Sequence, residues 1–376
     1  MKKSLISLAI LAASGAASAQ SNVTIYGIMD AGIVSEHGGK NGNVTKVGSG
    51  INSASRIGFK GTEDLGGGLS AVFTLETGIK EDTGELDNTS NRLFNRQAFV
   101  GLSSKTAGTL TLGRQYTPWY NTFVQVGDPF QAGLEGSAKN IFPANGINVR
   151  NDNSIVYRSP EFYGVSGELF YAMGEKAHAS TGRQLGASIG YQNGPLNVRV
   201  AYNNINNDTA VGSVVTEKQI GHNTLIAANY DFKVVKAYAM FGSNKGLNSA
   251  NLTSASLPGA TTGLPAGLPA GSSFSAYNGS VVSPSLDSRT WLVGANVPVS
   301  AAGSIIVSYA KVDDKTYDQD AHQAAIGYTH SLSKRTNLYL SYAKINNKNG
   351  ASYIVGNNSD VGTGDSAYSV GIRHAF

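Results

Sequence analysis

The sequence predicts an all-β protein, a transmembrane antiparallel β-barrel of about 16 strands. Three observations lead to this fold class: an export leader, the lack of any segment able to form a membrane helix, and strands in which apolar and polar residues alternate. The last strand shows the alternation most clearly, because Tyr368, Val370 and Ile372 share one face while Ser369 and Arg373 lie on the other. Such a strand suits a wall between lipid and water, and equally a soluble β-sandwich, so the rest of the chain has to decide.

The first residues have the character of a secretory signal peptide, since Lys2 and Lys3 precede an apolar run and a small-residue cleavage site at Ala19. We therefore expect residues 1–19 to be removed and residues 20–376 to form one barrel domain. No later segment offers the roughly 20 consecutive apolar residues that a membrane helix requires. Strands must then make any membrane crossing.

The composition agrees with a protein built of strands and turns. The chain has 46 glycines, 18 tyrosines and only 14% charged residues, whereas charged residues usually reach about 25%. It has no cysteine, which excludes disulfides and thiolate metal sites. The formal net charge is +4, and without the two leader lysines 27 basic residues stand against 25 acidic ones. This balance gives no indication of nucleic acid binding.

Alternating segments and turn signals divide the mature chain into sixteen expected strands. These are 23–34, 53–60, 69–80, 93–103, 109–114, 154–158, 165–173, 184–192, 196–203, 218–230, 236–243, 289–299, 304–312, 322–332, 336–345 and 366–376. Short turns such as 64–68 and 105–108 alternate with long polar loops. In outer-membrane barrels this rhythm places short turns at the periplasmic end and long loops outside. An even strand count also brings Phe376 back beside Val23.

Charges inside the strands follow the same alternation. Arg56 and Lys60 lie on the polar face of their strand, opposite Ile57 and Phe59. An arginine on the lipid face near the midplane would cost roughly 2 to 4 kcal/mol. We therefore expect both cations to point into a water-filled lumen, which a barrel of this size is wide enough to hold.

Two loops are unusual. The connection 115–153 is long and carries an aromatic cluster as well as Asp128 and Glu135. An unstructured loop of that length is uncommon unless it has a function. The segment 246–287 contains a tandem Leu-Pro-Ala-Gly repeat and is expected to be a mobile extracellular loop of low complexity.

Several motifs together resemble the general-diffusion porins of Gram-negative bacteria, in particular their beta-proteobacterial branch. The matching stretches are 23–27, 56–66, 96–102, 108–115, 154–160 and 371–376. The resemblance implies a barrel in the outer membrane that assembles as a homotrimer, with the third loop folded into the pore. It further implies outer-membrane lipid and lipopolysaccharide as surroundings, small hydrophilic solutes and ions as cargo, and no cofactor.

The resemblance also implies a pore constriction in which basic wall residues face acids on the third loop. By matching motif the wall residues are Arg56, Arg96 and Arg150, with Lys60, Arg114 and Arg158 as neighbours, and the facing acids are Asp128 and Glu135. The residues alone leave alternatives open. Arg96 shares the parity of Ala98 and Val100, which would allow a subunit contact, and Arg114 shares that of Leu112, which favours the rim. Both acids could equally be solvated loop residues.

These features predict passive diffusion of small hydrophilic solutes, with a mild anion preference because bases outnumber acids at the expected constriction. A substrate-selective porin or an adhesin is one alternative, for which Trp119, Tyr120 and Phe123 would be a fragment of an aromatic track. An outer-membrane β-barrel hydrolase is another. Its best support is a scatter of serines together with His222, His322, His330 and His374, which have no nucleophile motif nearby and no third metal ligand, so we expect no enzyme.

Overall fold

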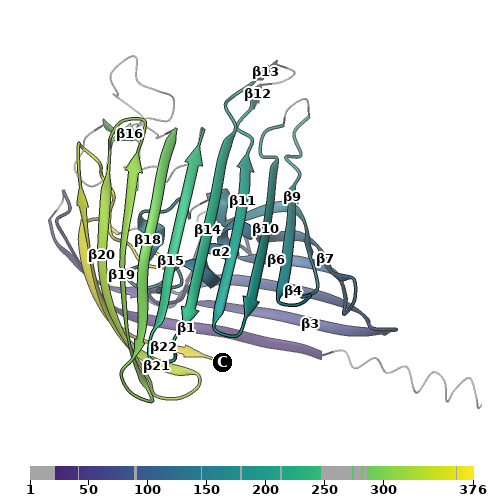
Figure 1. Cartoon of the computed structure of the whole chain (residues 1–376), viewed down its shortest axis with the longest axis horizontal. Coiled ribbons are helices and arrows are strands. Elements are labelled where there is room, and N and C mark those ends of the chain that lie inside the picture. The colour runs from purple at the N-terminus through teal and green to yellow at the C-terminus, as the bar shows by residue number, and fades with distance from the viewer. Residues whose placement is uncertain are drawn as a thin grey trace, which may run out of the picture.

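The chain forms a closed antiparallel β-barrel in the computed structural model (Figure 1). The structure describes residues 22–40, 42–88, 91–144, 146–177, 180–211, 214–246, 273–274, 281–282, 286–360 and 362–376. The signal peptide expected at 1–19 and most of the loop expected at 246–287 lie outside these residues. Within the described ranges, no helix combines the length and apolar character needed to cross a bilayer.

The main sheet of the described chain has 18 strands. Two of them, β2 (Val44–Ser49) and β5 (Glu85–Leu86), are short and are not counted as separate barrel strands. The sixteen barrel strands are β1 (Asn22–His37), β3 (Arg56–Gly66), β4 (Leu69–Lys80), β6 (Gln97–Ser104), β7 (Gly108–Tyr116), β8 (Arg150–Arg158), β9 (Val165–Ala172), β10 (Gln184–Asn193), β11 (Leu196–Ile205), β14 (Gly221–Asp231), β15 (Lys236–Lys245), β18 (Asp287–Pro298), β19 (Gly303–Asp314), β20 (Ala321–Ser331), β21 (Thr336–Asn347) and β22 (Ser366–Ala375). Each pairs with its neighbour along the chain, so the predicted fold class is confirmed.

The ring closes where the first strand meets the last. β1 pairs with β22 over ten residue pairs, from Ile28 opposite Ala375 to His37 opposite Ser366. Two further backbone hydrogen bonds, each of 3.1 Å, join Gly27 and Phe376. This ladder joins the two ends of the sixteen-strand sheet, as a membrane-spanning sheet requires, because unpaired backbone groups are costly in lipid.

The second barrel strand is interrupted, which the sequence did not predict. The strand β2 (Val44–Ser49) pairs with one half of β1, and β3 pairs with the other half. Residues 50–55 between them leave the wall, and Ile51, Ala54 and Ser55 are buried. The expected strand 53–60 therefore begins three residues late, at Arg56.

Short turns and long loops segregate to opposite ends of the barrel, as expected. The turn between β3 and β4 has Gly66, Gly67 and Gly68 at φ values of 83°, 62° and 81°, a region that only glycine enters freely. The long loops carry small strand pairs: β5 (Glu85–Leu86), β12 (Thr209–Val211) with β13 (Val214–Thr216), and β16 (Ser273–Phe274) with β17 (Val281–Val282). β5 pairs only with the end of β4.

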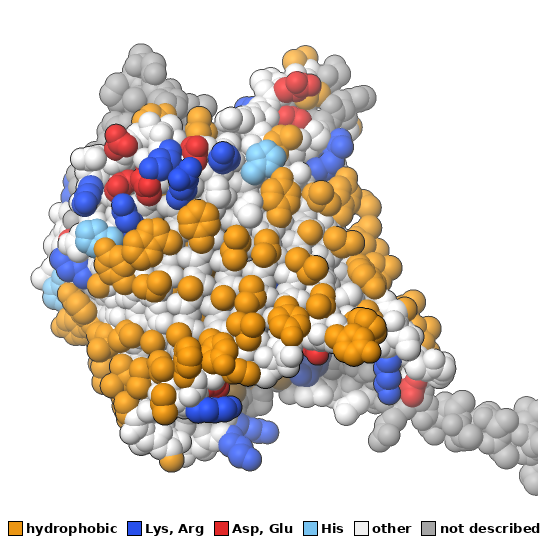
Figure 2. Space-filling model, viewed as in Figure 1, with side chains coloured by type: hydrophobic (Ala, Val, Ile, Leu, Met, Phe, Trp, Pro, Cys, Tyr) orange, Lys and Arg blue, Asp and Glu red, His pale blue; other side chains and the backbone are white. Residues whose placement is uncertain are grey.

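The barrel wall is apolar outside and polar inside. A broad band of hydrophobic side chains crosses the side of the barrel seen in Figure 2, and charged side chains gather above and below it. Along β22, Tyr368, Val370 and Ile372 are exposed on the outside, whereas Ser369 faces inward and donates or accepts a hydrogen bond with Ser341. This pattern is that of a wall between lipid and a wet lumen.

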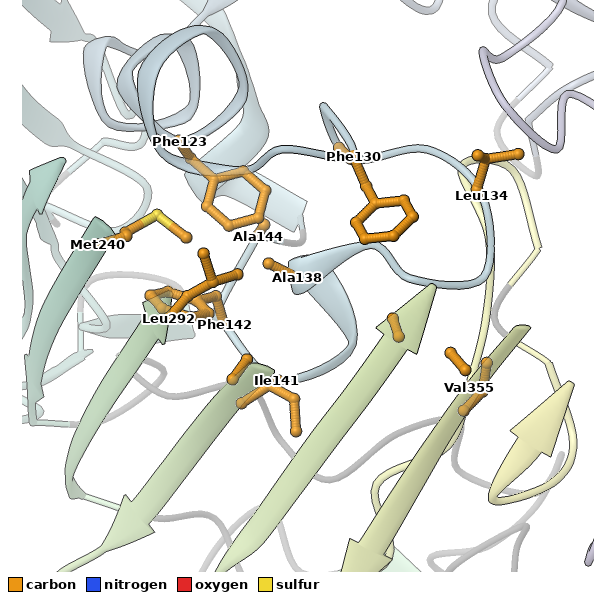
Figure 3. Close-up of a cluster of buried hydrophobic side chains, with 14 of the residues drawn as sticks. Phe123, Phe130, Leu134, Ala138, Ile141, Phe142, Ala144, Met240, Leu292 and Val355 are labelled. Atoms are coloured by element: carbon orange, nitrogen blue, oxygen red, sulfur yellow. The ribbon is translucent and has the colours of Figure 1, made fainter. Parts of the chain in front are cut away.

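The third loop, residues 117–149, provides much of the buried core inside the barrel. It contains the helix α2 (Pro118–Thr122), the π-helix η1 (Phe123–Gly127), the 3-10 helix η2 (Ala138–Asn140) and the helix α3 (Gly146–Val149). The Thr117 side chain caps α2 by accepting from the Tyr120 N–H, and proline fills the first helical position. The loop packs with Phe123 and Phe142 against Met240 of β15 and Leu292 of β18 (Figure 3).

Barrel closure gives a testable expectation for Phe376. Its ring lies where a Cβ on Gly27 would be, so it covers the seam between the first and last strands. Since the ring is 45% exposed, we expect Phe376→Ala to lower the free energy of unfolding by about 1 to 2 kcal/mol. Urea unfolding of the refolded protein in detergent micelles measures the change. Phe232→Ala, in the turn after β14, is the control and should have little effect; equal losses for both variants would contradict this role.

Candidate functional site: the arginine cluster and the third loop

Three arginines of the barrel wall converge on one side of the lumen. Arg56 and Arg96 line a pocket of about 290 Å³ together with Tyr116 and Tyr120. The Arg150 guanidinium lies 5.1 Å from the centre of the Tyr116 ring, over its face. We call Arg56, Arg96 and Arg150 the arginine cluster. It brings together residues from β3, β8 and the segment just before β6.

One carboxylate on the wall, that of Glu76, joins two members of the cluster. The Arg96 Nε donates to Glu76 Oε1 at 2.8 Å, and the Arg56 Nη1 lies 3.8 Å from the same oxygen. The Tyr26 hydroxyl donates to Glu76 Oε2 at 2.9 Å, and the Arg96 Nη2 donates to the Tyr116 hydroxyl at 2.7 Å. Two of the three cations thus share one carboxylate, and Arg150 instead contacts the Asn95 carbonyl and the Tyr116 ring, so this side of the lumen is positive. Sequence reasoning missed Glu76, although its parity with Thr74 in β4 could have placed it inward.

Arg96 points inward because it precedes its strand rather than belonging to it. The sequence predicted a strand at 93–103, in which Arg96 would share a face with Ala98. β6 instead begins at Gln97, which pairs with Glu76, and the Arg96 backbone N–H donates to the Glu76 carbonyl at 3.1 Å. The irregular backbone reverses the parity at this point and buries the side chain to 6% exposure.

Arg114 lies in a separate ion-pair network next to the cluster. The register of β7 against β8 shifts between Gly113 and Gln115, so Arg114 leaves that ladder while it still pairs with Ala98 of β6. Its Nε donates to the Asn95 carbonyl at 2.6 Å, and its Nη1 contacts Asp152 Oδ1 at 2.7 Å. The expected neighbours Lys60 and Arg158 line a different pocket, of about 400 Å³, nearer the short turns.

Both acids of the third loop are buried, Asp128 within the loop itself and Glu135 against the last long loop. Asp128 accepts hydrogen bonds from the backbone N–H groups of Phe130, Ala132 and Ala138 at 3.0, 2.9 and 3.1 Å. Glu135 is also buried. The structure therefore differs from the expectation that these acids face the arginines, because the carboxylate of Asp128 is needed to satisfy amides of a tight turn. The loop groups that line the arginine pocket are instead Tyr120, Asn121, Val124, Gln125 and Gln131.

The tip of the third loop is clasped by the last long loop, residues 348–365. Asn357 Nδ2 donates to Glu135 Oε1 at 3.5 Å, and Lys139 Nζ donates to the Asn358 carbonyl at 2.6 Å. Burial raises the pKa of the Glu135 carboxyl to about 7. Burial likewise lowers the pKa of the Lys139 ammonium to about 8. The loop is thus attached by polar contacts whose charges are sensitive to pH near neutrality.

The lumen geometry agrees with what comparisons with known proteins find. The model of the Gram-negative porin family matches residues 5–350. The chain belongs to this porin family. It is 34% identical over 395 residues to outer membrane porin protein 32 of Delftia acidovorans, covering 100% of both chains. An outer membrane porin of Bordetella pertussis is also 34% identical, again over the full length of both chains.

Among solved structures, the porin resembles the anion-selective porin from Comamonas acidovorans. The TM-score is 0.73 and the sequence identity 30%, over 95% of this chain and 100% of that one. The outer membrane is accordingly the location of this porin, and its class is a non-enzymatic channel.

The histidines that supported a hydrolase do not gather in the described part of the chain. His222 contacts the Tyr202 hydroxyl, His330 that of Tyr328, and His374 that of Thr336. The described residues contain no group of three His, Cys, Asp or Glu side chains able to hold a metal ion. Family membership favours the channel over the hydrolase.

The buried carboxyl of Glu135 predicts a pH dependence of stability. The pKa of Glu135 is about 7 in the folded protein, above the ordinary 4.5. The stability that this carboxyl adds to the folded state is therefore fully present below about pH 4.5 and is lost as the pH rises through about 7. We expect Glu135→Gln to reduce the fall in the thermal unfolding midpoint across this window, as measured by circular dichroism in micelles. Glu217→Gln, at an exposed acid, should keep the wild-type profile. An unchanged profile for Glu135→Gln would contradict the assignment.

Proposed function

We propose that the barrel is a water-filled channel for passive diffusion of small hydrophilic solutes and ions, with a mild preference for anions. Its narrowest section lies between the arginine cluster and the facing side of the third loop. The observation that carries the proposal is the shared pocket, which Arg56 and Arg96 line from the wall while Tyr120, Asn121 and Gln125 line it from the loop.

The anion preference follows from the charge balance of that section. Three guanidinium groups lie on this side of the lumen, and Glu76 is the carboxylate that contacts two of them, Arg56 and Arg96. The third loop lines the pocket with neutral groups, because Asp128 is bonded within the loop and Glu135 contacts the last long loop. Low-dielectric walls focus the field of these charges into the water between them. Anions are therefore attracted into the opening, while its size sets the cutoff for uncharged solutes. A 30% identical neighbour is described as anion-selective, which agrees with this balance.

The burial of the aromatic side chains of the third loop favours a general channel over a substrate-selective one. Trp119 and Phe123 stack on each other at 5.5 Å between ring centres, and both are fully buried. Such rings are part of the loop's packing and present no open track to a passing sugar. Tyr120, which lines the arginine pocket, is held in the same packing, because it stacks on both Phe123 and Tyr116.

We further propose the orientation and partners that are usual for the family. The short turns face the periplasm and the long loops face outward, and three copies assemble as a homotrimer. Lipid and lipopolysaccharide surround the wall. Supporting the lipid contact, the cations Lys245 and Arg289 are exposed on the outer wall at the loop end, and Arg289 lies two residues from Trp291 in β18. Cations just beyond an aromatic residue suit the level of lipid headgroups.

Reversal potentials in a salt gradient test the proposed selectivity. We expect wild-type channels in planar bilayers to favour chloride over potassium, and Arg56→Gln with Arg150→Gln to reduce the ratio by roughly two- to fivefold, since two of the three cations are lost. Arg335→Gln, in the short turn before β21, is the control and should keep the wild-type ratio. A clear preference of the wild-type channel for potassium would defeat the proposal.

A further inference from the structure

We infer that the lumen holds a second anion site, a pocket of threonine hydroxyls around Lys60 that receives phosphate-bearing solutes. It would lie between the arginine cluster and the mouth formed by the short turns. The inference rests on the proposed channel function and adds a class of solute to it. We call this pocket the Lys60 pocket.

The Lys60 pocket is distinct from the arginine pocket. Its volume is about 400 Å³, and it shares no lining residue with the pocket of about 290 Å³ at Arg56 and Arg96. Its polar lining consists of two cations and five threonines together with Asn22: Lys60, Arg158, Thr24, Thr62, Thr74, Thr109 and Thr111. These side chains come from β1, β3, β4, β7 and β8, and β6, which lies between β4 and β7 in the wall, adds Phe99 to the lining.

Hydroxyl groups surround Lys60 on three sides. Thr24 of β1 and Thr74 of β4 lie directly opposite Lys60 in the two ladders of β3, and Thr62 follows two residues later on the same face. Directly opposed residues have Cβ atoms about 5 Å apart. Within the described chain these three hydroxyls have no hydrogen-bond partner, so they are free to bind a solute.

The charge of Lys60 is equally available. Its Nζ lies 5.2 Å from the centre of the Tyr26 ring, and among the described residues it has no acidic partner. The second cation, Arg158, is partly neutralised, because its Nε lies 3.5 Å from Glu168 Oε1. Lys60 is therefore the principal charge of the pocket, and Arg158 forms its far margin beside Thr109.

This combination suits a phosphate group better than a chloride ion. A lysine ammonium binds phosphate as a point charge, and hydroxyls donate to the remaining phosphate oxygens. The same hydroxyls accept from the hydroxyl groups of a sugar. Chloride is attracted mainly by the charge of Lys60, so the threonine hydroxyls strengthen its binding less than they strengthen that of phosphate. The pocket should thus retain inorganic phosphate and, more strongly, a sugar phosphate.

The position of the Lys60 pocket makes it a second binding site along the same channel. Lys60 follows Arg56 by four residues along β3, a rise of about 13 Å toward the turn at Gly66. An anion that leaves the arginine cluster in this direction reaches Lys60 before the mouth. Two sites in series allow an anion to bind and still move on, which conduction requires.

Inhibition of chloride current tests the inference. Purified channels in planar bilayers carry chloride while inorganic phosphate or glucose 6-phosphate is added at rising concentration. We expect glucose 6-phosphate to reduce the wild-type current at lower concentration than phosphate, and glucose at the same concentrations to have no effect. Lys60→Gln should raise the half-inhibitory concentration about tenfold. Thr62→Val with Thr74→Val, which removes two hydroxyls at nearly constant volume, should raise it about threefold.

Lys236→Gln is the matched control. Lys236 also faces the lumen near the short turns, with its Nζ 5.4 Å from the centre of the Tyr238 ring, but its ladder neighbours are Asp231 and Asn296 rather than threonines. It should change the half-inhibitory concentration less than twofold. Equal effects of Lys60→Gln and Lys236→Gln, or no effect of the double threonine variant, would overturn the inference while chloride conduction still stood. Loss of the wild-type chloride current itself would instead defeat the proposed function.

Discussion

The structure depends on the closure of one ladder, the pairing of β1 with β22. In a bilayer no water is available for unpaired backbone groups, so a sheet can cross it only when its two edges meet. Once they meet, the alternation of each strand decides which side chains face lipid and which face water. Arg56 and Lys60 are turned inward by this rule, and Ile57 and Phe59 outward. The charges of the lumen are thus a consequence of closure and parity together.

In the function that we propose, the third loop makes this wide cylinder selective. It fills part of the lumen with its own apolar core, in which Phe123 and Phe142 pack against Met240 and Leu292. Its acid Asp128 is used to hold a turn, and Glu135 contacts the last long loop. Neutral groups remain to face the arginines. The same loop therefore narrows the passage and leaves the positive charge of the wall largely unopposed.

Strand identity could be read from the sequence, whereas local departures from regular pairing could not. All sixteen expected strands are present, because the period of two is repeated in each and turns punctuate them. Arg96 was ambiguous because an irregular backbone before β6 reverses its parity, and parity arguments hold only inside a regular ladder. The break at residues 50–55 was missed for the same reason. The orientation of Asp128 depends on amides of Phe130 and Ala138, a tertiary contact that no periodicity encodes.

The central claim is that the narrowest section lies between the arginine cluster and the loop face that carries Gln125. Because the chain has no cysteine, a single Gln125→Cys variant can be modified there with a bulky uncharged maleimide. Complete modification should lower the single-channel conductance by roughly half or more, whereas modification of Tyr163→Cys, in the exposed turn between β8 and β9, should leave it unchanged. An unaltered conductance after complete modification of Gln125→Cys would contradict the account.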